Sequence, residues 1–371
     1  MAVVVNFLTE KRHSFLQYLQ IVQPLRDRAR ESHKVLLAIV FVTNLVDNLL
    51  LTSVVPIIPQ FLLNLDRKEF DIGRHNLTEI ITTDSRIKPY HGDEKYDNLT
   101  NGGQFNYSHD VAQGFSVSSV AMSENGRVGW LLSSKAIVQL FANPFVGPLC
   151  NKVGYPLVLL VGASLFFISS IVFAIAESYI PLFIARSVQG FGSAAATIAG
   201  MSIVAQSYPD DCGRSRAMGI AMGGAAFGIL VGYPFGSFTY TFVGKTVAFL
   251  IIAGVVLLDL GMQWFVFGLQ NRKESQGEVT PLQVLLKDRY IIIASGAIML
   301  TTMSMSVLEP TVPLWVMGFM HVENWELGLI FLPDSVGYFV GTNCFGVVAR
   351  NIGRAMCTLC CMLMIALCQI C

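Results

Sequence analysis

Five ionisable side chains interrupt otherwise apolar stretches of this sequence: Asp47, Lys135, Arg186, Asp259 and Glu309. A charge at the centre of a lipid bilayer costs about 2.5–3.5 kcal/mol on insertion scales, so it normally faces the interior of a helix bundle and serves a function. Carboxylates placed there can bind a cationic amine, hold a proton, or do both in turn. The pattern therefore predicts a polar pathway for a small cation or a proton.

Asp47 is the clearest of these residues, because it lies in the middle of an apolar stretch and is flanked by Asn44 and Asn48. We predict that Asp47 and Asn48 belong to a substrate-binding site. The alternative is that Asp47 is only the structural partner of Lys135.

Two further groups of polar residues share helix faces. Lys135, Gln139 and Asn143 follow one another at i, i+4 and i+8, which places them on one face and predicts a cavity lining. The alternative for the lysine is that its ammonium extends to the membrane surface. Arg186 and Gln189 form a similar pair, in which Arg186 either contacts an acid across the cavity or anchors the lumenal end of its helix.

The remaining two acids differ in their surroundings. Asp259 has Gln263 one turn later, and it either has a function of its own or satisfies a neighbouring helix. Glu309 is followed at once by Pro310 and Pro313, as happens at the binding sites and hinges of transporters. The first apolar stretch also holds an acid followed by two prolines. Proton coupling needs such carboxylates, so we predict that Asp259 and Glu309 join the ion-pair network.

Other motifs favour structural explanations. The chain has no Gly-x-Ser-x-Gly, no phosphate-binding loop and no metal-ligand spacing, so we expect no enzyme activity, no metal and no cofactor besides protons as the coupling ion. Five of the eight cysteines crowd residues 357–371, where small apolar residues of a membrane helix are favoured over a zinc site. A glycine stripe recurs every fourth residue and predicts close helix packing; its members are Gly224, Gly228, Gly232 and Gly236.

The composition fits a membrane protein with many spans. Of the 371 residues, 53% are hydrophobic and 13% are charged, and the net charge is zero. An ordinary soluble domain has about 25% charged residues. These values exclude a disordered chain, a basic nucleic-acid binder and almost any soluble enzyme. We expect an all-α integral membrane protein.

Nine stretches are long and apolar enough to cross a bilayer, which takes about 20 residues. They lie near residues 35–62, 126–149, 155–177, 179–207, 216–240, 246–270, 289–319, 326–349 and 354–371. Six spans, a polar connector and further spans are the plan of transporters with two six-helix halves. The ninth span reaches the C-terminus without a polar flank, so we expect the chain to lack three helices of an expected twelve.

This plan gives each segment a side of the membrane. Lys and Arg concentrate in segments that lie inside when the N-terminus is cytoplasmic, and the short outer loops hold only Lys245. The long first outer loop carries three glycosylation sequons, so we expect it to be lumenal and glycosylated at Asn76, Asn98 and Asn106. The expected parts are a cytoplasmic tail (1–34), a six-helix half (35–270) with the lumenal loop 64–125, a cytoplasmic connector (271–288) and a partial second half (289–371).

A short repeat supports the two-half plan. Gly147 and Gly154 flank a polar turn after the second span, and Gly346 and Gly353 flank one after the eighth span. Both turns occupy the second-to-third-helix connection of their half. We interpret the repeat as an internal duplication.

Taken together, these motifs resemble a known family from about Val35 to the end of the chain. They are similar to the vesicular amine transporters, which are proton antiporters of the major facilitator superfamily, and to the monoamine branch more than to the acetylcholine branch. The motifs are Asp47-Asn-Leu-Leu-Leu-Thr, Val-Val-Pro56-Ile-Ile-Pro59, Ser-Lys135-Ala, Asn143-Pro-Phe-Val-Gly-Pro, Ala-Arg186-Ser-Val-Gln-Gly, Val-Gly232-Tyr-Pro-Phe-Gly-Ser, Leu-Glu309-Pro-Thr-Val-Pro-Leu-Trp and Phe-Leu-Pro333.

The resemblance implies a role for each matching residue. Asp47 matches the amine-binding acid of the family, Asn48 its polar neighbour, and Lys135 the lysine of an internal ion-pair network. Arg186 and Glu309 match the arginine and the acid that join substrate handling to proton handling in the family. Phe331 and Tyr338 match aromatic residues that line the transport pathway. Departures are Thr302 in place of an Asn and Asp334 in place of a small residue. No cysteine lies in the lumenal loops that carry a disulfide in vertebrate members, so we expect no such bridge.

The resemblance also implies a function, which is the exchange of lumenal protons for cytosolic monoamines in acidic synaptic or secretory vesicles. The implied partners are a small protonated amine and the lipid bilayer, with no nucleic acid; the oligomeric state stays open. One alternative is a non-transporting truncated isoform or fragment that acts as an interaction partner. Another is a vesicular acetylcholine or drug/proton antiporter of the same superfamily.

Overall fold

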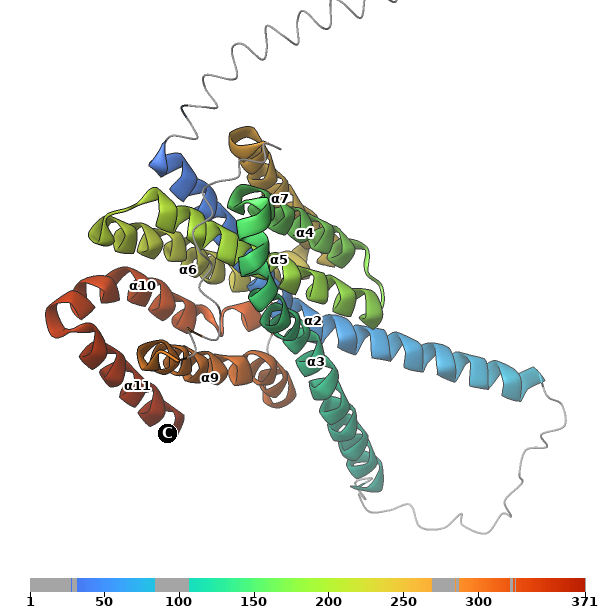
Figure 1. The fold of residues 1–371 in the computed structure, drawn as a ribbon. Coiled ribbons are helices and arrows are strands. Elements are labelled where there is room, and N and C mark those ends of the chain that lie inside the picture. The colour runs from blue at the N-terminus through green and yellow to red at the C-terminus, as the bar shows by residue number, and fades with distance from the viewer. Residues whose placement is uncertain are drawn as a thin grey trace, which may run out of the picture.

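The protein is a bundle of long helices. The computed structural model describes residues 28, 32–83, 107–268, 284, 287–320, 323 and 325–370, and all regular structure in these ranges is helical (Figure 1). The elements are α2 (His33–Thr83), α3 (Tyr107–Val153), α4 (Tyr155–Ile175), α5 (Tyr179–Ser207), α6 (Asp211–Phe242), α7 (Lys245–Phe267), α9 (Arg289–Phe319), the short 3-10 helix η1 (Glu326–Gly328), α10 (Leu332–Ile352) and α11 (Arg354–Ile370).

Each of the nine predicted spans falls on one of the long helices, in the predicted order. Within the described ranges, six helices are long and apolar enough to cross a membrane by length and composition: α2, α4, α5, α6, α7 and α9. The all-helical architecture expected from the sequence is therefore confirmed.

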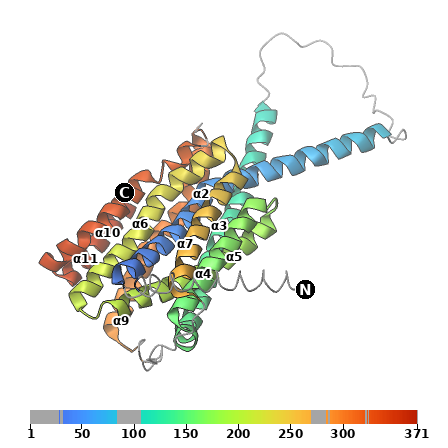
Figure 2. The same cartoon turned by 90° about the horizontal axis from the view of Figure 1, so that it is seen from above.

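Two helices continue beyond the predicted spans into the hydrophilic segment 64–125. α2 runs on to Thr83 and α3 already begins at Tyr107. Both extensions project away from the bundle, as the two views show (Figures 1 and 2). A helix bonds its own backbone and continues equally well in water, so hydropathy marks where a span ends but not where its helix ends.

The eighth span also begins later than predicted, at Leu332 instead of residue 326. Residues 326–328 form η1 instead, and Pro333 follows in the first turn of α10, where a proline is well accommodated. The proline pairs of α2 and α9 lie inside continuous helices, so no break marks the acids beside them.

The first six long helices bury a common core. α2 packs against α6, and α4 lies between α5 and α7. α3 packs against α5, whereas α10 packs against the outer side of α6. The apolar side chains of α9 are much more exposed, with Ile293 and Met303 above 60%. The structure therefore places its best-packed interior at the polar residues of the first half.

The two turns of the sequence repeat have the same backbone geometry. Gly154 separates α3 from α4 with φ 103°, and Gly353 separates α10 from α11 with φ 98°. Only glycine adopts this conformation easily, because it has no Cβ. Equivalent turns at equivalent positions support the interpretation of the repeat as a duplication.

The glycine stripe of α6 packs closely against another helix, as predicted, and its partner along the whole stripe is α2. A Cβ at Gly236 would lie 2.6 Å from the carbonyl oxygen of Ser53, and one at Gly228 would overlap the carbonyl oxygen of Leu45. The two backbones therefore touch, and polar side chains of α2 such as Asn44 and Ser53 reach backbone carbonyls of α6.

We expect Gly228→Ala to destabilise the protein by about 1–3 kcal/mol, because overpacking forces α2 and α6 apart. Gly261→Ala in α7 is the matched control, since a Cβ there would meet nothing within 4 Å. Thermal unfolding of both purified variants in detergent measures the difference. Equal midpoints for the two variants would show that the stripe does not determine the packing.

Candidate functional site

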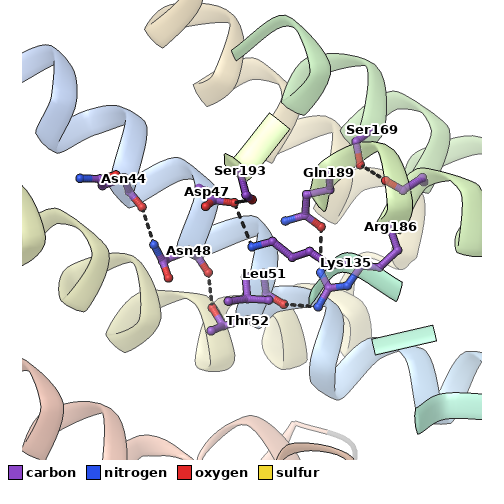
Figure 3. A network of polar contacts seen from close by, with 11 residues as sticks. Asn44, Asp47, Asn48, Leu51, Thr52, Lys135, Ser169, Arg186, Gln189 and Ser193 are labelled. Carbon is purple, nitrogen blue, oxygen red and sulfur yellow. Dashed lines mark hydrogen bonds and ion pairs between the residues drawn. The ribbon is translucent and has the colours of Figure 1, made fainter. Parts of the chain in front are cut away.

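A buried ion pair joins three helices at the centre of the first half. The ammonium of Lys135 on α3 donates to Asp47 Oδ1 on α2 at 3.1 Å. Ser193 Oγ on α5 donates to the same carboxylate oxygen at 2.6 Å (Figure 3). The side chains of Lys135 and Asp47 are only 8% and 10% exposed. Asp47 and Lys135 are therefore direct partners in the structure, as the structural interpretation of Asp47 predicts.

Close helix packing explains how these groups meet. A Cβ at Gly190 of α5 would overlap the backbone carbonyl of Lys135, so the backbones of α3 and α5 touch at the lysine. Ser193 lies one turn after Gly190 and shares its face. The glycine therefore allows both Lys135 and Ser193 to reach Asp47.

Arg186 lies beside this pair and is only 1% exposed. Its Nη1 donates to Gln189 Oε1 at 2.8 Å, and its Nη2 donates to the carbonyl oxygen of Leu51 on α2 at 3.4 Å. In the part of the chain that the structure describes, no acid forms an ion pair with Arg186, so its predicted direct contact with an acid is not found.

The two asparagines beside Asp47 have different partners. Asn44 Nδ2 donates to the carbonyl oxygen of Ala221 on α6 at 3.1 Å, which ties α2 to the glycine-rich helix. Asn48 is half-buried, and its Nδ2 donates to the carbonyl oxygen of Asn44 at 2.9 Å. Asn48 therefore bonds to the backbone of its own helix and not to Asp47.

Asp259 lies between α7 and α2, and it is fully buried. Thr43 Oγ1 lies 3.1 Å from its Oδ2, and Gln263 Nε2 donates to that same oxygen at 2.9 Å. Among the described residues, no Lys or Arg pairs with Asp259. This geometry favours the partner-helix interpretation of Asp259, because its carboxyl oxygen Oδ2 contacts Thr43 of α2 and Gln263 of its own helix, both of them uncharged.

The polar stripe of α3 turns inward at only one of its three positions. Lys135 is buried, Gln139 is half-buried and Asn143 is exposed. This part of α3 stays in the core, because Val146 and Cys150 are buried, so the exposed Asn143 lies on a different face of the helix. Spacing along the helix alone could not separate buried from exposed members.

Glu309 and Phe331 of the second half contact Tyr233 of the first half, a residue that the sequence analysis does not single out as a site residue. Tyr233 of α6 donates its hydroxyl to Glu309 Oε1 at 2.9 Å. Its ring stacks on Phe331 with 4.6 Å between centroids and 19° between planes. Tyr338 is 40% exposed on α10 and does not join this cluster. The only signal for Tyr233 was one aromatic residue within a glycine stripe, which was interpreted as packing alone.

A polytopic helical bundle with a buried carboxylate–ammonium pair at its centre has the architecture of a membrane transporter. Residues 36–371 match the model of the Major Facilitator Superfamily. The synaptic vesicular amine transporter of Rattus norvegicus is 41% identical over 374 residues, which cover 96% of this chain and 72% of the rat protein. The chromaffin granule amine transporter of Rattus norvegicus is 40% identical, with 95% and 73% covered.

A more distant relative comes from the acetylcholine branch. The vesicular acetylcholine transporter of Drosophila melanogaster is 36% identical, with 87% of this chain and 51% of the fly protein covered. The chain therefore belongs to the vesicular amine transporters of the Major Facilitator Superfamily.

Proposed function

We propose that the protein is a transmembrane monoamine/proton antiporter that loads cytosolic amine neurotransmitters into acidic synaptic or secretory vesicles. The observation that carries the proposal is the buried pair of Asp47 and Lys135. A primary ammonium already occupies the carboxylate, and a protonated monoamine carries the same chemical group. The names of the similar rat proteins, which are amine transporters, support the same substrate class.

The geometry suggests how amine and proton would compete. An unpaired carboxylate in the bilayer is costly, so Asp47 holds Lys135, a substrate ammonium, or a proton. Ser193 donates to Asp47 Oδ1 and keeps the carboxylate oriented in each case. Asn48 offers a neighbouring amide. If the amine binds one conformation more tightly and the proton binds the other more tightly, amine transport and proton transport are coupled.

Amine binding and uptake test this proposal. The purified protein in nanodiscs is expected to bind radiolabelled serotonin or dopamine more tightly than acetylcholine or a neutral analogue. Accumulation in acidified vesicles that disappears when the pH gradient is collapsed supports the antiporter. Binding without any accumulation supports the non-transporting alternative, and preference for acetylcholine supports the other branch of the family.

We further propose that the N-terminus is cytoplasmic and that the segment 64–125 is lumenal. Asn76 lies in the extension of α2, and Asn98 and Asn106 lie outside the described residues.

We expect the protein made in animal cells to lose mass on endoglycosidase treatment, because glycan is added only on the lumenal side. Replacing all three asparagines with Gln should abolish that shift, which gel mobility measures. A shift that persists in the triple variant, or none in the wild type, would contradict the proposed topology.

A further inference from the structure

Tyr233 lies at the contact between α6 and the segment 309–331, which we call the seam. The seam consists of Tyr233 and Ser237 on α6 and of Glu309, Gly328 and Phe331 on the other side. It is tightly closed, because a Cβ at Gly328 would lie 2.6 Å from Ser237 Cβ and would overlap the carbonyl oxygen of Tyr233. The seam therefore joins the first six long helices to the last three.

Tyr233 is held on three sides within the seam. Its hydroxyl donates to Glu309 of α9, its ring stacks on Phe331 just before α10, and its backbone touches Gly328 of η1. Its side chain is only 1% exposed. The seam therefore contains a hydrogen bond whose acceptor is a carboxylate.

The bond depends on charge because its acceptor is a carboxylate. A hydrogen bond to an ionised carboxylate is about twice as strong as one between neutral groups. The titratable and charged groups on the elements packed around the pair are Arg186 of α5, Asp334 of α10, Lys135 of α3 and Asp47 of α2. A protonated Glu309 accepts this bond as a neutral group, so the bond weakens when the acid takes up a proton.

We propose that Tyr233 is a positioning residue that keeps the seam closed while Glu309 is ionised and lets it open when Glu309 takes up a proton. The inference rests on the proposed function and deepens it. It names the contact through which proton binding changes the conformation. The stack on Phe331 and the contact with Gly328 remain after protonation, so the hydroxyl bond is the part that responds to pH.

The test uses a thiol at the seam. Ser237 is only 2% exposed, so Ser237→Cys, in a chain whose eight native cysteines are replaced, reports opening by its rate of alkylation. In nanodiscs, where the reagent reaches both sides, the alkylation rate is divided by that of a fully exposed cysteine at the same pH, because alkylation needs the thiolate. This relative rate should be low at neutral pH and higher at acidic pH. Tyr233→Phe removes only the hydroxyl and should label about ten- to a hundredfold faster at neutral pH, with little further change on acidification.

Two variants complete the test. Glu309→Gln mimics the protonated acid and should label fast at every pH. Tyr208→Phe is the matched control, because its hydroxyl contacts only the backbone carbonyl of His33 at the exposed end of α5, and it should behave like the parent. Labelling of Tyr233→Phe that matches the parent at every pH would overturn the proposal. The readout needs no amine. A protein that binds no amine but whose seam opens in acid would therefore refute the proposed antiport and still support the proposed role of Tyr233.

Discussion

Asp47→Asn is expected to weaken the binding of a protonated amine by about 10–150-fold, because a hydrogen bond to a charged group contributes about 1.5–3 kcal/mol. The substitution keeps the size of the side chain and its ability to accept a hydrogen bond from Ser193. It removes the negative charge and the titratable proton. An amine that leaves water then has no anionic partner at this position, so proton-dependent exchange should be lost as well.

Equilibrium binding of radiolabelled serotonin to purified wild type and variant measures this effect. Asp259→Asn is the control, since Asp259 is buried against Thr43 and Gln263 without a cation and should bind amine almost normally. Near-normal affinity of Asp47→Asn, or an equal loss in both variants, would contradict the assignment of the amine site to Asp47.

Lys135→Met is expected to destabilise the fold by about 3–5 kcal/mol, because it leaves the buried carboxylate of Asp47 without its cation. Methionine preserves most of the apolar stem of lysine, so packing changes little. The double variant Asp47→Asn with Lys135→Met has no buried charge at this position and should regain much of the lost stability.

Thermal or detergent-induced unfolding of the three variants measures the coupling between the two residues. A double variant that is as unstable as the sum of the two single variants would show that Asp47 and Lys135 act independently, contrary to the ion pair in the structure. Restored stability without restored amine binding would separate the structural role of the pair from its role in binding.

The sequence predicted the elements well because a membrane imposes a simple rule. Apolar stretches of about 20 residues mark helices, and all nine predicted spans fall on long helices. The same rule missed the extensions of α2 and α3, because helices outside a bilayer need no apolar residues. It also placed the start of the eighth span too early, where η1 and a proline precede α10.

The site was predicted in part. The cost of a charge in lipid singled out Asp47, Lys135 and Arg186, and all three are buried near one another. Their partners depend on which helices touch, which spacing along one helix does not contain. Tyr233 shows this limit, since its contact with Glu309 joins residues 76 positions apart. The amine-binding role of Asp47 and its neighbours stays a prediction.

Proton release on amine binding tests the central claim most directly. Calorimetric titration of a monoamine into the purified protein, in buffers that differ in ionisation enthalpy, measures the protons exchanged. If amine and proton compete for the buried carboxylates, binding should release protons and weaken as the pH falls, and Asp47→Asn should show neither effect. Binding without proton exchange, or equal binding of a neutral analogue, would contradict the claim.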